Sequence, residues 1–289
     1  MLIFKQISDL RAYLASYRAE GRRIGFVPTM GALHEGHLSL LAASRSACAV
    51  SVCSIFVNPT QFNEAEDFQK YPRTTARDIE LLEAAQCEVL FLPDVPEIYP
   101  TPNEPPPQFD FGYLDKPLEG RHRPGHFAGM AQVVKRLLEI VQPNDLYMGQ
   151  KDFQQAAIVG QMIKILNLPT RLVVCPTLRE PDGLAMSSRN TRLSVEERGK
   201  AVVLYQTLVW AKEHIAELAP EMLQKMAMKR LSDTEGVLPE YFEVADSQTL
   251  RPITSAEIAN NTATTIVALV AARLGSVRLI DNMVIKEGK

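Results

Sequence analysis

The sequence predicts an α/β protein with a doubly wound parallel sheet, followed by a smaller α+β domain. The first 175 residues or so alternate short apolar runs with amphipathic helical patterns, as buried parallel strands and their crossover helices do. This alternation stops after Cys175 and Pro176, where a long helical pattern and then closely spaced strand patterns follow. A length of 289 residues also suits two domains. We therefore predict a Rossmann-like domain at 1–176 and a small α+β domain at 177–289.

Five apolar runs of the first domain are expected to form its strands, because they are continuous and rich in β-forming residues. They span residues 24–28, 49–57, 88–92, 145–148 and 171–174. Helical patterns at 38–41, 79–82 and 153–166 lie between them. Residues 93–107 hold seven of the 19 prolines, and this density predicts an extended surface loop inside the domain.

The second domain is expected to begin with a helix and to continue with strands. Ser194 and Glu197 form a capping-box pattern, which predicts a long helix from there through Ile215. Strand patterns follow at 241–244, 264–270 and 277–280. Helices followed by closely spaced strands are typical of an α+β domain.

Composition indicates a soluble, cytoplasmic protein. Lys and Arg number 31 against 34 Asp and Glu, so the formal charge of −3 argues against a chain that coats nucleic acid. No apolar run approaches the roughly 18 residues of a membrane-spanning helix, and the first residues turn polar too soon for a secretory signal. The four cysteines form no Cys-x-x-Cys pair and lie in apolar stretches, which favours buried, reduced thiols.

The strongest functional signal lies directly after the first strand, at Met30 to His37. A turn that leads into a helix is expected to offer free backbone amides and a positive dipole end to a phosphate. His34 and His37 would add imidazole donors near such a group. The alternative is an ordinary strand–helix turn with two surface histidines. A zinc protease motif needs His-Glu-x-x-His, and a phosphate loop needs Gly-Lys-Ser/Thr, and neither is present here.

A second polar segment runs from Met186 to Asn190, after the predicted domain boundary. Two hydroxyls and a guanidinium make this segment a candidate phosphate clamp, although taken alone it is better explained as an ordinary polar turn before a helix. The early His-x-Gly-His turn and the late Met-Ser loop together resemble the paired ATP signatures of class I aminoacyl-tRNA synthetases and related nucleotidyltransferases.

Further segments narrow this resemblance. They are 56–62, 71–74, 123–127, 149–155 and 278–282. In this order and spacing the chain resembles the pantothenate synthetases (pantoate–β-alanine ligases), from Met1 to Asn282. The resemblance implies that ATP adenylates pantoate, with magnesium carried on the phosphates and no dedicated metal site. The amine of β-alanine would then attack the pantoyl adenylate. It also implies a homodimer, with no nucleic-acid or membrane partner.

The resemblance also implies roles for individual residues. His37 would be the catalytic residue, described chemically as a doubly donating imidazolium beside the α-phosphate, and Gln61 and Gln155 would bind pantoate. Gln61 would also contact β-alanine. The ATP-binding residues would be Met30, Gly31, Ala32, Leu33, His34, Glu35, Gly36, His37, Gly149, Gln150, Lys151, Asp152, Leu178, Met186, Ser187, Ser188 and Arg189.

Some positions depart from the synthetase pattern or stay without a firm role. Ala185 stands where the tRNA synthetase loop begins with lysine, so Lys151 and Arg189 are expected to supply the phosphate cations. The loop at 186–189 is expected to act as part of a lid over the nucleotide. Tyr71, Asp78, Glu119 and Arg123 are expected to be either scaffold or site.

Three other functions stay open at this point. A cytidylyltransferase would share the early turn but would not explain residues 58–62 or Gln155. A tRNA synthetase would need more chain and a basic surface for its tRNA. A nucleotide-binding sensor without turnover is disfavoured by the intact polar set.

Overall fold

The computed structural model describes residues 1–289 except 63–64, 102–104, 261–262 and 289. The described residues divide into two compact units. The first unit consists of Met1–Gln150 with Gln155–Pro176, and the second of Lys151–Gln154 with Thr177–Lys289. The short segment Lys151–Gln154, which interrupts the first unit in sequence, thus belongs with the second. No helix in the described ranges is both long and apolar enough to cross a membrane.

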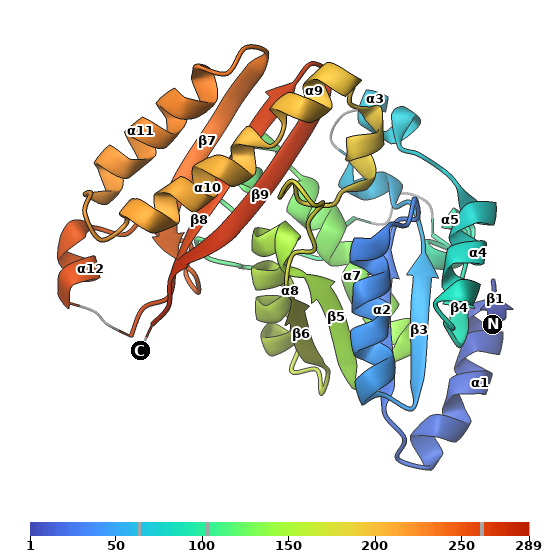
Figure 1. The fold of residues 1–289 in the computed structure, drawn as a ribbon. Helices are drawn as coiled ribbons and strands as arrows, with labels where there is room; N and C mark the ends of the chain where they lie inside the picture. The colour runs from blue at the N-terminus through green and yellow to red at the C-terminus, as the bar shows by residue number, and fades with distance from the viewer. Residues whose placement is uncertain (63–64, 102–104, 261–262, 289) are drawn as a thin grey trace. The chain divides into compact units, whose positions relative to one another are not determined.

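In the part of the chain that the structure describes, the first unit contains a parallel sheet with the strand order β1-β4-β3-β2-β5-β6 (Figure 1). Its strands are β1 (Leu2–Phe4), β2 (Ile24–Thr29), β3 (Val50–Ile55), β4 (Val89–Phe91), β5 (Asp145–Gly149) and β6 (Arg171–Cys175). The chain builds outward from β2 through β3 and β4, then returns to the other side of β2 with β5. The order therefore reverses between β2 and β5, the place where doubly wound sheets bind ligands. The predicted fold class is confirmed.

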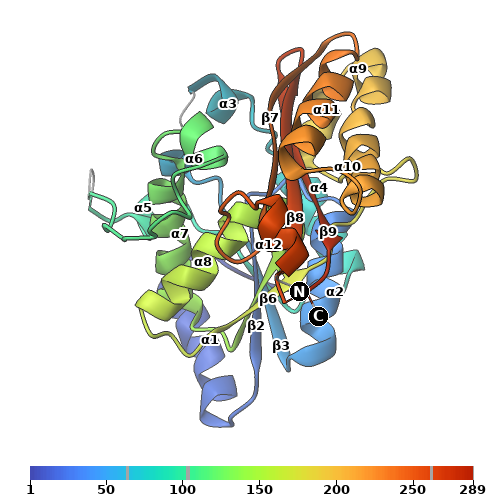
Figure 2. The same cartoon turned by 90° about the vertical axis from the view of Figure 1, so that its left-hand side faces the viewer.

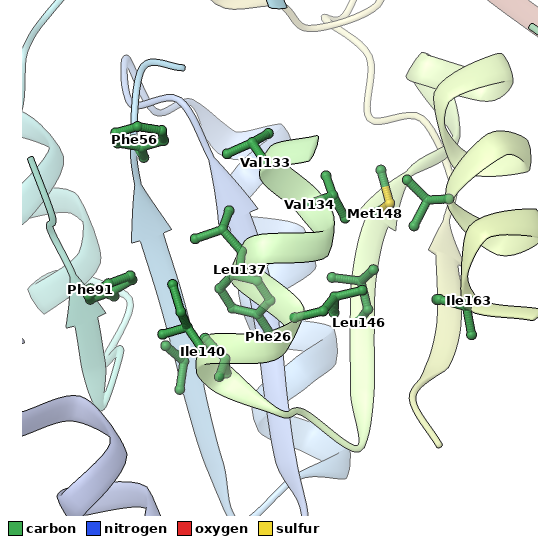
Figure 3. Close-up of a cluster of buried hydrophobic side chains, with 14 of the residues drawn as sticks. Phe26, Phe56, Phe91, Val133, Val134, Leu137, Ile140, Leu146, Met148 and Ile163 are labelled. Atoms are coloured by element: carbon green, nitrogen blue, oxygen red, sulfur yellow. The ribbon is translucent and has the colours of Figure 1, made fainter. Parts of the chain in front are cut away.

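Helices cover both faces of this sheet. Helices α1 (Ile7–Ala19), α7 (His126–Val141) and α8 (Phe153–Ile165) lie on one face, and α2 (Glu35–Ala47) lies on the other (Figure 2). On the first face, Leu137 and Ile140 of α7 pack over Phe26 of β2 within one buried apolar cluster (Figure 3). The remaining helices of the unit are α3 (Ala65–Lys70), α4 (Thr75–Ala84), α5 (Val95–Ile98), α6 (Glu119–His122) and the short 3₁₀ turn η1 (Pro59–Gln61).

The second unit pairs a meander of antiparallel strands with helices. Its described strands have the order β7-β8-β9. They are β7 (Val237–Asp246), β8 (Ile266–Leu274) and β9 (Val277–Lys286), and the helices are α9 (Val195–Lys200), α10 (Val203–His214), α11 (Pro220–Ser232) and α12 (Ser255–Asn260), with the 3₁₀ turn η3 (Ser188–Arg192). The 3₁₀ turn η2 (Gln150–Asp152) begins in the first unit and ends in the second. Leu208 of α10, Leu223 of α11 and Val270 of β8 share its apolar core.

Most predicted elements are found, but the structure also changes some of them and adds others, such as α1 and α7. Strand β1 was not predicted. Helix α5 lies inside the segment 93–107 that was expected to be extended, and residues 102–104 of that segment lie outside the described residues. The long helix expected after Ser194 is two helices, α9 and α10. Strands β7 and β9 are longer than their patterns predicted.

A buried carboxylate lies at the amino ends of the strands, far along the sheet from the ends where ligands are expected. Asp145, the first residue of β5, is fully buried and pairs with Arg23 and with Arg171 Nε, the latter at 2.7 Å. Burial alone would raise the pKa of this carboxyl, but the two guanidinium groups outweigh it and lower the pKa below its ordinary value. The ionised form of Asp145 therefore stabilises the fold.

Candidate functional site

The predicted residues of the first unit gather at the carboxyl ends of β2, β3 and β5. The turn from Met30 to His34 follows β2, Gln61 ends the turn η1 after β3, Gly149 ends β5 and Gln150 begins η2. These are neighbouring or nearby strands of one parallel sheet, so their carboxyl ends share an edge. Gln155 lies in the first turn of α8, which also starts from that edge.

Backbone conformation in the turn after β2 is unusual. Gly31 and Ala32 have φ values of +79° and +49°. This region suits glycine, but for alanine it costs about 1–2 kcal/mol. Asp78 of α4 compensates for that cost, because its carboxylate accepts from Ala32 N at 2.9 Å and from Leu33 N at 2.8 Å. The carboxylate is 1% exposed, and Thr74 Oγ1 donates to it at 3.1 Å.

The two histidines cap the first turn of α2. His34 Nδ1 accepts from Gly36 N at 3.2 Å, and His37 Nδ1 accepts from His34 N at 3.3 Å, which together form a capping box. The two rings lie close, with centroids 4.0 Å apart. A nitrogen that accepts carries no proton, so each neutral ring holds its proton on Nε2. Each side chain is therefore a hydrogen-bond donor at Nε2.

These contacts correct two expectations about the turn. The backbone N–H groups of Gly31, Ala32, Leu33, His34 and Gly36 all donate to side chains of the protein itself. The prediction that this turn offers free amides to a phosphate is wrong for these groups. The role of His37 as a doubly donating imidazolium is also disfavoured, because its Nδ1 is engaged as an acceptor. The donors of the two side chains in this turn are the imidazole Nε2–H groups.

Gln61 is held by buried polar partners. Asn58, 1% exposed, donates from Nδ2 to Gln61 Oε1 at 3.2 Å and accepts from Tyr99 OH at 3.0 Å. Gln61 Nε2 donates to Met30 Sδ at 3.0 Å. The structure thus brings the expected pantoate residue Gln61 into contact with the expected ATP residue Met30. Asn58 lies in the segment 56–62, which carries the family resemblance but predicts no role for this residue.

The residues without a firm role now have structural partners. Asp78 holds the turn after β2, as described above. Tyr71 is buried and packs edge-on against Phe62, with ring centroids 5.6 Å apart. Glu119 of α6 pairs with Arg123 at 3.7 Å. Asp78 bonds directly to a predicted ATP segment, through Ala32 N and Leu33 N.

The second unit carries the other predicted ATP residues. Asn282 of β9 donates from Nδ2 to Lys151 O at 2.8 Å, so the strand anchors the segment that contains Lys151 and Asp152. Met186 N donates to Leu178 O at 3.0 Å, which ties the two ends of the loop before Ser187. Ser187 caps η3 by accepting from Arg189 N at 3.3 Å, and Ser188 is buried.

A buried ion pair supports these segments. Arg179 binds Asp281 through two hydrogen bonds of 2.6 and 3.0 Å and also donates to Asn282 O at 3.2 Å. The Arg179 guanidinium stacks on Tyr205, 4.6 Å from the ring centroid. Burial raises the pKa of Asp281, and Arg179 opposes that shift. The segment 278–282 thus anchors both Lys151 and the loop around Arg179. In the sequence, this segment is notable only for its resemblance to the family.

Within the described ranges, no group of three or more His, Cys, Asp or Glu side chains has the arrangement to hold a metal ion.

Comparison with known proteins gives a consistent result. Residues 2–284 match the family model described as pantoate-beta-alanine ligase. The chain is 44% identical to the pantothenate synthetase of Bacteroides thetaiotaomicron over 287 residues, covering 99% of this chain and 100% of that relative. It is 45% identical to the pantothenate synthetase of Aquifex aeolicus, covering 97% and 98% of the two chains.

Solved structures agree with the sequence matches. The crystal structure of pantothenate synthetase from Thermus thermophilus is similar with a TM-score of 0.91 and 38% identity, over 99% of this chain and 100% of that one. The pantoate-beta-alanine ligase from Francisella tularensis, solved with beta-gamma ATP and beta-alanine, has a TM-score of 0.79 and 36% identity over 99% and 98%.

Proposed function

Because the chain belongs to the pantoate–β-alanine ligase family, and is thus an enzyme that joins these two substrates, we propose that it does so through an enzyme-bound pantoyl adenylate. In the first step a carboxylate oxygen of pantoate attacks the α-phosphorus of ATP, and pyrophosphate leaves. In the second step the amine of β-alanine attacks the acyl carbon, an amide forms, and AMP leaves with the bonding electrons.

The observation that carries this proposal is the paired capping of α2. Two imidazoles that hold their protons on Nε2 stand at a helix amino end, at the reversal point of the sheet. Negative charge that builds on phosphate oxygens during adenylation is stabilised by such preorganised donors and by the helix dipole. We assign His37 the catalytic role and His34 a contact with the phosphates.

Cations and hydroxyls in the second unit suit the leaving pyrophosphate. Lys151 and Arg189 would neutralise phosphate charge, and the hydroxyls of Ser187 and Ser188 would donate to phosphate oxygens. The backbone at Leu178 would contact adenine, and Asp152 the ribose. We propose ATP as a substrate that brings magnesium on its phosphates.

Neutral amides suit the acid substrates. Gln61 and Gln155 offer donors and an acceptor to the hydroxyls and carboxylate of pantoate without adding charge, and Gln61 would also contact β-alanine. We further propose a cytoplasmic homodimer, whose mass in solution can be measured by light scattering, and no partner among nucleic acids or membranes.

The test is exchange of labelled pyrophosphate into ATP. Exchange should require pantoate and magnesium but not β-alanine, because activation precedes attack by the amine. A reaction with β-alanine and without pantoate is the matched control and should show no exchange. Normal formation of pantothenate without any exchange would refute the adenylate mechanism.

A further inference from the structure

The first turn of α7 contacts Gln61 through a buried histidine that the proposed function leaves without a role. His126 is 5% exposed. Its Nδ1 lies 2.8 Å from the backbone oxygen of Gln61, and its Nε2 lies 3.1 Å from Nη1 of Arg123. Arg123 and His126 lie in the segment 123–127, which contributes to the family resemblance but has no assigned function.

The partners of His126 determine which nitrogen carries the proton. A guanidinium group has donors and no acceptor, so Arg123 donates to Nε2. Nε2 is therefore unprotonated, and the ring proton lies on Nδ1, where it is donated to the carbonyl oxygen of Gln61. Glu119 pairs with Arg123 at 3.7 Å and helps hold the guanidinium beside the ring.

Close packing of α7 against η1 supports the same contact. A Cβ at Gly129 would lie only 2.0 Å from Thr60 O, so the helix approaches as near as glycine allows. Asn58 bridges the two elements, since its Nδ2 donates both to Gly129 O and to Gln61 Oε1, each at 3.2 Å. His126 and Gly129 are three residues apart and share a helix face. That face fixes the backbone of Gln61, while Asn58 fixes its side chain.

We propose that His126 is a positioning residue for pantoate, acting through the peptide group of Gln61. Its Nδ1–H locks the carbonyl of Gln61 and so sets the direction in which the amide side chain leaves the backbone. The inference rests on the proposed function, in which Gln61 binds pantoate. A histidine that only stabilised the fold would affect all ligands of the unit alike, whereas a positioning residue affects pantoate selectively.

Calorimetry with pantoate and with ATP separates these roles. His126→Ala should weaken pantoate binding by about tenfold, the usual effect of one lost hydrogen bond to a buried group, while ATP binding stays within about twofold. His126→Asn retains an amide donor near the position of Nδ1 and should recover most of the lost affinity. Arg123→Met, which releases the ring from its fixed tautomer, should weaken pantoate binding by a smaller factor and serves if His126→Ala does not fold.

The matched control is His214→Ala. His214 also bonds a backbone carbonyl through Nδ1, Trp210 O at 2.8 Å, but lies in the second unit, so pantoate affinity should not change. Unchanged pantoate binding in folded His126→Ala, or equal losses for pantoate and ATP, would overturn the inference. If the unaltered chain fails to bind pantoate, the proposed function fails first, and the positioning role falls with it.

Discussion

Replacing Asp78 by Asn should damage the turn after β2. The carboxylate accepts two backbone N–H groups, Ala32 N and Leu33 N, together with the hydroxyl of Thr74. Asparagine has one acceptor oxygen and one NH₂ group. One of the two N–H groups would therefore face another donor in a nearly water-free position.

The magnitude follows from these contacts. A hydrogen bond to a charged group contributes about 1.5–3 kcal/mol, and an N–H group left unpaired in a buried position places the cost at the upper end of that range. We expect the free energy of unfolding to fall by about 3 kcal/mol. At roughly 2–4 °C per kcal/mol for a unit of this size, the melting temperature should fall by about 6–12 °C.

Calorimetry and pyrophosphate exchange would measure the two consequences. Exchange should fall as well, because the same turn leads into the helix that His34 and His37 cap. Asp246→Asn is the control, since Asp246 Oδ1 likewise accepts two N–H groups and a Thr249 hydroxyl, but at an exposed turn of the second unit. There the single amide oxygen of asparagine can keep all three bonds and water solvates the new NH₂ group, so the cost should stay below about 1 kcal/mol. A melting curve for Asp78→Asn that overlays the curve of the unaltered protein would refute the reasoning.

Four further changes have defined outcomes. His37→Ala should lower the turnover of adenylation by about two to four powers of ten, and single-turnover kinetics that show no change would return this residue to a capping role. Replacing Ser188 and Arg189 by Ala should slow adenylation more than attack of β-alanine on supplied pantoyl adenylate, and equal losses would mean that the loop orders the whole site. Gln155→Leu should weaken pantoate binding and spare ATP binding in calorimetry, and the reverse pattern would contradict its assignment. Asp145→Asn should lower the free energy of unfolding at pH 7 by about 1–3 kcal/mol. Because the folded-state pKa of this carboxyl is lowered from 3.8, that difference should shrink as the pH falls below about 4, and a difference that does not depend on pH would be the contrary result.

The sequence predicts the fold well where its signals are local and long. The buried runs of β2 and β3 and the helix α8 appear almost as their patterns indicate. Strand β1 has only three residues and forms by pairing with β4, which is distant in the sequence. No local sequence pattern therefore predicts it. Strand β7 extends across Pro239, which is tolerated because the residue lies on an edge strand at a register shift.

The break between α9 and α10 has a local cause that the pattern conceals. Ala201 and Val202 keep helical backbone angles, with ψ near −25° and −21°. Leu204 N, however, donates to Ala201 O, three residues back, so the hydrogen-bond ladder tightens for one turn. Apolar periodicity does not register a change in bonding of this kind.

Sequence reasoning finds the candidate site by its motifs and misses what holds them. The spacing of His34 and His37 indicates donors at a helix start, and the structure places both there. The carboxylate of Asp78, more than forty residues along the chain, takes two of the amides that a local view treats as available for phosphate. His126 contacts Gln61 across 65 positions of sequence. Such partners come from tertiary packing, which composition and periodicity do not encode.

The short segment Lys151–Gln154 has a consequence for exchanging parts between related enzymes. It follows β5 closely and includes the first two residues of α8, yet it belongs with the second unit, and Asn282 bonds its first carbonyl. A chimaera joined only after Pro176 would combine a lysine-bearing segment from one parent with an anchoring amide from another. A sound exchange needs two junctions, so that residues 151–154 travel together with 177–289 as one inherited piece.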